Sequence, residues 1–534
     1  MSGFRQPEIP RKQLHLWGQR LEDALPEDHP VRLLDQLLNA AAFADTFAAW
    51  EQDYDRLSGQ PPYHPRVLAG LYLYGLLSRL RSSRQLEMAC HNRIDVLWLM
   101  SGQKPDHATI AAFVTEHAAR LKQLKQAVLE VGIRARLVSL DHAAVDGTKL
   151  EADAGRGAVW SEEKIRAELA KLDGQLAAWE AEWQANEQRE RALFGEHTPW
   201  IPPPGARSEK HRLARAQRAQ QRLHQALAAL QRRQAEAAAV DSQVPKAIAV
   251  VTDPDSRVLK DKEGRRKPNY NAQLAVDSAA GMIIADAVND RAEDSGQLTP
   301  LLDQVAENCG RLPVEASADS QYNTGPELAK LEELGVTGYV AAVHQPSDGA
   351  APPAAQQEAL AAVRAGAELT QAQWAALPKN QAKYFDKAAF VYDGVHDEYR
   401  CPAGQRLPLV KRSTDCTRAG PIVRRHYGGR ACGTCSQAAG CCRTPARGRM
   451  VNRDEHEEQR DRMRARLATE VGRRRYALRQ QTVEPRIGLL KHGLGVRRFL
   501  RRGLAKVASE WSWLCVAVNV GILLRQWEVV RRVL

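Results

Sequence analysis

The first part of the chain reads as a series of helices, because its apolar residues recur around helical turns. Residues 64–80 are apolar on all sides, which predicts a deeply packed helix. Ser82 and Gln85 have the spacing of a capping box and predict the start of another helix, and Asp106 is a candidate N-cap for a third. The arginines near these helices are compatible with a helix-turn-helix-like unit that contacts DNA, and a plain helical support domain is the alternative.

A change of pattern separates the first predicted strand, residues 137–146, from a long helical stretch. Residues 161–191 and 208–239 are rich in Ala, Gln, Leu and charged residues, and prolines between them forbid one continuous helix. We therefore expect an antiparallel helical hairpin. Its first arm leans acidic and its second basic, so the arms can attract each other. A solvated spacer is the expected role, and contact of the second arm with a phosphate backbone is the alternative.

Strand and helix signals then alternate, which is typical of an α/β domain with a mixed sheet. The expected elements are strands at 270–278 and 281–289, a helix at 295–308, a strand ending at Asp319, a helix at 324–333 and a strand at 336–343. Residues 345–378 are rich in Ala, Pro and Gln and predict a loose excursion. Helix is expected again from about residue 454 to the end.

No segment predicts membrane insertion. The longest apolar run, residues 511–524, has 14 residues, short of the ~20 that span a bilayer, so we expect a buried helix. The start of the sequence has no apolar core of a signal peptide. These features predict a cytoplasmic protein without a membrane partner. The net charge of +12 favours a polyanionic partner such as DNA or RNA.

Cysteine is concentrated in one segment, since six of nine Cys lie between residues 401 and 442. In a reducing compartment this clustering favours a metal over disulfides. The ligand count of a structural zinc site is met by four residues: Cys401, Cys432, Cys435 and Cys441. Cys442 is a substitute for Cys441, with Cys416 and His426 as further candidates. Free cysteines in a surface insert are the alternative interpretation.

Three acidic residues far apart in the sequence are the main candidates for chemistry. Asp146 and Asp319 each end an apolar run, and ligand-binding groups gather at the carboxyl ends of strands in α/β sheets. Asp141 is a rival on the first strand. Taken singly, Asp146 is better explained as a turn residue, and Asp319 alone is likewise a weak signal.

Glu484 is the third candidate, because it is the one acid among eleven Lys and Arg between residues 471 and 506. On a continuous helix, Lys491 and Tyr476 would share its face, seven and eight residues away. Pro485 makes these angles approximate. A salt-bridged basic helix is the alternative interpretation.

Several segments together carry a resemblance to a known family. They are YHPRVLAGLYLYGLLSRLRSSRQLEMAC (63–90), KPDHATIAAF (104–113), VDGTKLEADA (145–154), ADSQYNTG (318–325), YRCPAGQRL (399–407) and YALRQQTVEPRIGLLKHGLGVRRFLRRGL (476–504). In this order they resemble bacterial insertion-sequence transposases of the DDE type with a Tyr-Arg-Glu-Lys signature. By motif, the catalytic and metal-binding triad falls on Asp146, Asp319 and Glu484. The signature falls on Tyr476, Arg479, Glu484 and Lys491.

The resemblance implies a ribonuclease H-like mixed-sheet core and a two-metal mechanism. Two Mg²⁺ or Mn²⁺ ions on the triad would activate water or a DNA 3′-hydroxyl and stabilise the leaving oxygen. The implied partner is double-stranded DNA, both the transposon ends and the target. The resemblance also implies that a homodimer binds this DNA, and that the protein is cytoplasmic and associated with the nucleoid. The expected DNA-binding residues are Tyr476, Arg479, Lys491, Arg497 and Arg498.

The signature departs from its usual spacing in one place, since four residues instead of three separate Arg479 from Glu484. This departure affects the assignment of Arg479 more than that of Glu484, and a catalytically silent DNA-binding protein of the same descent is the alternative. A zinc-clamped helical adaptor that binds nucleic acid is a further alternative.

The expected domain organisation follows from these assignments. It comprises an N-terminal helical domain with a possible DNA-binding role (1–132), the first core strand (133–160), a helical-hairpin insertion (161–240), the rest of the core sheet (241–344), an insertion with the Cys cluster (345–455) and C-terminal helices that complete the catalytic core (456–534).

Overall fold

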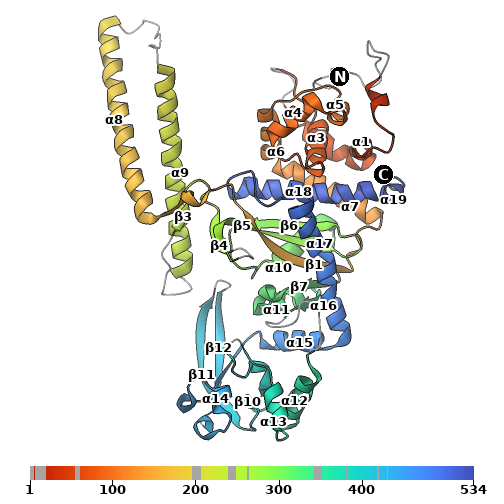
Figure 1. Cartoon of the computed structure of the whole chain (residues 1–534), viewed down its shortest axis with the longest axis vertical. Helices are drawn as coiled ribbons and strands as arrows, with labels where there is room; N and C mark the ends of the chain where they lie inside the picture. Colours follow the sequence, from red (N-terminus) through yellow and green to blue (C-terminus); the bar gives the residue numbers. More distant parts are fainter. Residues whose placement is uncertain are drawn as a thin grey trace. The chain divides into compact units, whose positions relative to one another are not determined.

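A computed structural model describes residue 5 and residues 20–54, 60–194, 206–238, 248–260, 264–341, 352–380, 382–417, 420–429 and 431–534. By their internal contacts these residues form two compact units. Unit 1 comprises Met1–Ala316 with Arg479–Leu534, and unit 2 comprises Ser317–Leu478. Each unit is described by itself (Figure 1).

The N-terminal part of unit 1 is helical, as the apolar pattern predicted. Its helices are α1 (Pro30–Asn39), α2 (Ala44–Glu51), α3 (Pro65–Leu77), α4 (Ser83–Asn92), α5 (Ile94–Met100), α6 (His107–Glu116) and α7 (Ala118–Arg134). Helix α3 is buried along most of its length. The capping box of Ser82 and Gln85 opens α4, and the Asp106 side chain accepts a hydrogen bond from the Thr109 amide at the start of α6.

The main sheet contains the strands β1 (His142–Glu151), β4 (Arg257–Lys260), β5 (Arg266–Asp277), β6 (Ile283–Asn289), β7 (Glu315–Ala318) and β8 (Thr337–Val340). The strand order is β4-β5-β1-β7-β8, and β6 also pairs with β5. The boundary between the two units falls inside β7. This mixed α/β architecture was predicted from the sequence, and it fits the ribonuclease H-like core that the family resemblance implies. A short separate sheet joins β2 (Val159–Ser161) to β3 (Ile248–Val250).

The first core strand begins later than predicted, which corrects the position of Asp146. Strand β1 starts at His142 and continues through Asp146 to Glu151, so Asp146 lies inside the strand and not at its carboxyl end. The apolar run before it is interrupted because Leu140 adopts a positive φ of 58°. The Asp277 carboxylate stabilises this turn by accepting hydrogen bonds from the Ser139 and Leu140 amides.

The apolar C-terminal run forms the core of α18 (Leu504–Arg525), as predicted. This helix is long and apolar enough to cross a membrane by length and composition, but 83% of its most apolar window is buried within the protein, as in the core helix of a soluble domain. Figure 1 shows α18 beside β5 and β6. Its Asn519 side chain accepts a hydrogen bond from the Ile283 amide at 2.7 Å and donates one to the Ile283 carbonyl at 2.8 Å.

The predicted helical hairpin consists of α8 (Glu162–Phe194) and α9 (Ala206–Ala238), which run side by side (Figure 1). A small apolar core joins the helices near one end and contains Ile165, Leu169, Leu223, Ala226 and Leu230. The predicted proline-rich connection lies outside the described residues.

The remaining helices of unit 1 are α10 (Leu298–Cys309), α17 (Glu484–Gly488), a π-helical turn (Leu489–Gly493) and α19 (Trp527–Val530). Helix α16 (Glu470–Thr482) begins in unit 2 and ends in unit 1.

Unit 2 contains a second sheet, ordered β13-β12-β11-β10-β9. Its strands are β9 (Val391–Asp393), β10 (Glu398–Arg400), β11 (Arg406–Thr417), β12 (Gly420–Gly428) and β13 (Met450–Asp454), and its helices are α11 (Gly325–Glu333), α12 (Ala354–Ala365), α13 (Gln371–Ala376), α14 (Ala438–Cys441) and α15 (Glu457–Ala468). The expected loose excursion is therefore wrong for α12 and α13. Their apolar side chains pack with Phe385 and Leu407 in one core, which an Ala-rich composition alone did not reveal.

Candidate active site

Asp146 lies in the centre of the sheet, on β1 opposite Leu274 of β5. Its side chain is 14% exposed. The next residue must be small, because a Cβ on Gly147 would lie 2.6 Å from an Asp294 carboxylate oxygen and would also overlap the Gln273 amide. Asp294 is itself buried and accepts hydrogen bonds from Asn271 and Gln273. The Asp-Gly pair is thus fitted to a polar network on the opposite face of the strand.

Arg479 brings two of the predicted acids together. Its Nη1 atom donates to Asp146 Oδ2 at 3.1 Å, and its Nη2 atom lies 3.8 Å from Glu484 Oε1. The guanidinium is only 7% exposed, whereas the Glu484 carboxylate is 46% exposed. Residues from the first strand and the C-terminal helices therefore meet at one partly open position of unit 1.

Glu484 is placed by a break in the helical ladder. Helix α16 ends at Thr482 and α17 begins at Glu484, with Pro485 in its first turn. A proline is tolerated there because the first amides of a helix have no partner within the helix. Lys491 follows in the π-helical turn and is half-buried. Tyr476, Glu484 and Lys491 therefore lie in three successive helical segments and not in one continuous α-helix.

Asp319 belongs to unit 2, where it directly follows β7 as predicted. It caps a short 3₁₀ turn, and its carboxylate accepts a hydrogen bond from the Gln321 amide at 2.8 Å. Because β7 pairs with β1 in the sheet order, the second predicted acid follows the strand next to the one that carries the first.

The predicted DNA-binding residues differ in exposure. Tyr476 is 2% exposed, and Arg479 is held by the acids. Arg497 and Arg498 are exposed. The backbone of this pair lies against the end of β1, since the Glu151 amide donates to the Arg497 carbonyl at 3.2 Å.

A buried carboxylate holds the basic segment that follows. Glu510 of α18 accepts hydrogen bonds from the Leu500 and Arg501 amides and pairs with Arg81 at 3.0 Å. Burial raises the pKa of Glu510, while Arg81 and the two amides oppose that rise. Arg81 also donates to the Arg498 carbonyl. Arg81, one of the arginines near the predicted helix-turn-helix, therefore forms contacts within the protein.

Several residues of this region were not predicted from the sequence. Gln273, Asn271 and Asp294 form their network across strands and a loop, and Glu510 contacts Arg81 across 429 residues. Buried polar residues in otherwise apolar segments, such as Glu510 in α18, are the one pattern that would have suggested such partners.

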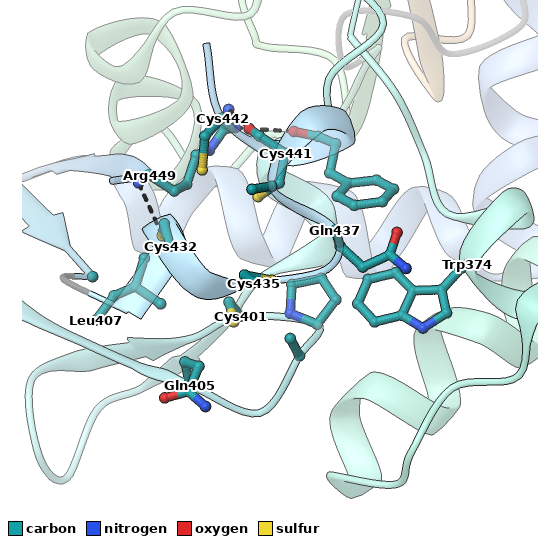
Figure 2. A pocket seen from close by; sticks show the side chains of 15 residues that line it. Trp374, Cys401, Gln405, Leu407, Cys432, Cys435, Gln437, Cys441, Cys442 and Arg449 are labelled. Carbon is teal, nitrogen blue, oxygen red and sulfur yellow. Dashed lines mark hydrogen bonds between the residues drawn. The ribbon is translucent and has the colours of Figure 1, made fainter. Parts of the chain in front are cut away.

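The clustered cysteines converge on one cavity of unit 2 (Figure 2). Five thiols line it: those of Cys401, Cys432, Cys435, Cys441 and Cys442. The cavity has a volume of about 30 Å³, enough for one or two water-sized particles, and not for an organic ligand. The Arg449 amide donates to Cys432 Sγ at 3.2 Å. All four predicted zinc ligands and the proposed substitute thus face the same small space.

A separate group of potential ligands lies on the β9–β10 hairpin. Atoms of Asp393, His396 and Glu398 lie within 4.8 Å of one another. His396 is exposed and already bonded to Asp393 at 2.8 Å, and Arg406 pairs with Glu398. These contacts are sufficient to explain the cluster as surface ion pairs.

Comparison with protein families yields two matches. Residues 400–524 match a family model described as Transposase DDE domain, and residues 19–116 match one described as Transposase domain (DUF772). No curated protein and no solved structure matches the chain. The first match includes Arg479 and Glu484, and the second includes the N-terminal helices α1 to α6. Together they confirm the resemblance seen in the sequence and support the assignment of this chain to the insertion-sequence transposases of the DDE type.

Proposed function

We propose that this transposase cuts and joins DNA at insertion-sequence ends, with Asp146, Asp319 and Glu484 as the catalytic carboxylates. The observation that carries the proposal is the contact of one guanidinium with both Asp146 and Glu484, 338 residues apart in the chain. Supporting it, Asp319 follows β7, which pairs with β1.

The carboxylates suit a hard divalent cation such as Mg²⁺ or Mn²⁺. Two of them approach the same guanidinium within 4 Å, so one positive charge can contact both. Bound at Asp146, Asp319 and Glu484, two such ions would supply a Lewis acid and an activated nucleophile for in-line displacement at phosphorus. The chain's own contribution is to hold the oxygen ligands in place and to restrict water, since Asp146 is mostly buried.

Arg479 acts in this proposal as the cation that holds the two carboxylates before metal and DNA arrive. Two acids brought together without a counter-charge repel each other, and a buried guanidinium relieves that repulsion. Lys491, Arg497 and Arg498 then neutralise phosphates of the bound DNA, with the exposed pair at the end of β1 best placed to do so. Tyr476 supports this segment from within the protein.

The test is strand cleavage by the purified full-length protein on duplex DNA that carries the element's own ends. Cleavage with Mg²⁺ or Mn²⁺ but not with excess chelator supports the proposal, and joining of the freed 3′-end to a second duplex supports strand transfer. Binding of the ends without cleavage under either metal would favour the catalytically silent alternative. The same experiment at varied protein concentration tests whether a homodimer holds the DNA, as expected for a nucleoid-associated cytoplasmic enzyme.

We also propose a structural zinc ion in the cysteine-lined cavity of unit 2. Cys401, Cys432, Cys435 and either Cys441 or Cys442 would supply the four sulfur ligands of a structural zinc ion. A backbone amide that donates to Cys432 fits this assignment, because such bonds stabilise a thiolate ligand.

Zinc content provides the test of this site. The protein should contain about one zinc per chain, and Cys435→Ser should lose it and lower the thermal stability of unit 2. Cys309→Ser, in α10 of unit 1, is the matched control and should retain the metal. Comparison of Cys441→Ser with Cys442→Ser identifies the fourth ligand. A wild-type protein free of zinc after metal-replete expression contradicts the site.

A further inference from the structure

The two helices of the hairpin differ sharply in charge. Helix α9 carries eight Lys and Arg against two Glu, and no acid occurs between Glu209 and Glu236. Helix α8 carries eight acids and five Lys and Arg. The hairpin lies outside both matched family regions, so its role does not follow from the family.

Three arginines of α9 form one exposed row. Arg215, Arg218 and Arg222 have the spacing i, i+3, i+7, which places them on one face of a helix. All three are exposed, and the row ends one turn before Ala226, which lies on the same face and is buried in the core between α9 and α8. Along the helix axis the row covers about 10 Å.

These arginines contrast with others in the same hairpin. Arg233, near the end of α9, is 11% exposed, pairs with Asp290 at 3.1 Å and donates to three backbone carbonyls. Arg166 and Arg191 of α8 each pair with a Glu one turn away. Within the described part of the chain, Arg215, Arg218 and Arg222 form no ion pair. They are not needed to hold the hairpin together.

We propose that this row of α9 is a binding surface for the phosphate backbone of duplex DNA. The proposal rests on the proposed function, because it takes DNA as the partner. Guanidinium groups bind phosphates strongly, and three in a row on one face, with no acid nearby on the helix, match a line of negative charge. Contacts of this kind carry no sequence information and serve to position the DNA.

The experiment measures binding of the full-length protein to a random-sequence duplex, in chelator, as a function of salt. Each lost phosphate contact lowers the slope of log affinity against log salt by about 0.9. Arg215→Gln, Arg218→Gln and Arg222→Gln combined should lower the slope by about 2 to 3 and the affinity at low salt by about tenfold or more. Helix content from circular dichroism should stay unchanged.

The matched control removes the same charge from α8 of the same hairpin. Arg166→Gln, Lys171→Gln and Arg191→Gln combined eliminate three cations that already pair with Glu residues, and the slope should fall by less than 1. If the two triple variants lower the slope equally, the loss of net charge alone explains the effect, and the proposal is overturned. An unchanged slope in the α9 variant, while the wild type still binds and cleaves its ends, would also overturn the proposal but leave the proposed function intact. A change of oligomeric state without a change of slope would assign the row to a second copy of the chain instead.

Discussion

Two places in the molecule hold carboxylates against arginine, and they are built in opposite ways. In unit 2, Glu457 is 4% exposed and contacts three cations: Lys387 at 2.8 Å, Arg464 at 2.8 Å and Arg460 at 3.2 Å. In unit 1, a single guanidinium contacts two carboxylates, one of which is 46% exposed. The first arrangement leaves the acid fully compensated and closed to solvent, as in a structural ion-pair network.

The second arrangement is what a site for an incoming cation requires. Two carboxylates share one guanidinium at a partly open position, which leaves an excess of negative charge there. Clustering of acids and arginines is therefore not informative by itself. The ratio of charges and the exposure of the acid separate a structural cluster from a candidate active site.

The largest expected effect comes from the carboxylate at the centre of the sheet. Asp146→Asn retains the shape of the side chain but removes a charged oxygen ligand, so cleavage of transposon ends should fall on the order of a thousandfold or more. DNA binding should be retained, which gel-shift and cleavage assays on one preparation can measure.

Asp141→Asn is the control for that variant. Asp141 is exposed and precedes β1, so its substitution should leave cleavage unchanged. Undiminished cleavage by Asp146→Asn would remove this residue from the triad.

An intermediate effect is expected from the closed cluster. Burial alone would raise the pKa of Glu457, but Lys387 and Arg464 outweigh it and lower the pKa to about 2. Glu457→Gln should therefore lower the free energy of unfolding at neutral pH by about 1 to 3 kcal/mol. Part of the stabilisation that the Glu457 ion pairs provide is offset, because burial also lowers the pKa of Lys387. Chemical denaturation followed through unit 2 measures the loss.

The pH dependence of this cluster has a definite sign. Because the folded pKa of Glu457 lies below its unfolded value near 4.5, its stabilising contribution is present above pH 4.5 and is lost as the pH falls toward 2. Glu457→Gln should flatten the acid side of the stability profile. Glu458 is 73% exposed, so Glu458→Gln should change neither the free energy of unfolding at neutral pH nor the acid side of the profile. A similar loss of stability in both variants would contradict the role of burial.

The smallest expected effect concerns the guanidinium between the two acids. If Arg479 stands in for a metal ion, Arg479→Gln removes a competitor and should tighten Mn²⁺ binding about tenfold, as measured by calorimetry without DNA. Cleavage should not increase in parallel, because the carboxylates lose the group that holds them.

Arg474→Gln provides the control in the same helix, since Arg474 is 78% exposed and pairs with Glu470. Weaker Mn²⁺ binding by Arg479→Gln alone would show that the positioning of the carboxylates by Arg479 outweighs its competition with the metal, and would contradict this prediction.

Much of the fold could be predicted, because it rests on local pattern. The deeply packed α3, the capping box of α4 and the buried α18 follow from apolar spacing and capping residues that lie within one element. The start of β1 could not be predicted in this way. It depends on the Asp277 carboxylate, which holds the Leu140 amide from 137 residues away.

The candidate site shows the same difference between local motifs, which could be predicted, and long-range contacts, which could not. The identities of the three acids came from motifs, but the role of Arg479 did not. Its unusual spacing from Glu484 made it the least certain member of the signature, and the structure places it against Asp146, a contact between residues 333 positions apart. Long-range contacts of this kind leave no periodic trace in one sequence.

Asn519 has a consequence for how the protein is made. Its side chain forms hydrogen bonds with both the amide and the carbonyl of Ile283, a residue synthesised 236 positions earlier. Until α18 leaves the ribosome, these groups of β6 stay open to pairing with another chain. A prematurely terminated product would thus be prone to aggregate, and cells would be expected to clear it before it could engage a transposon end.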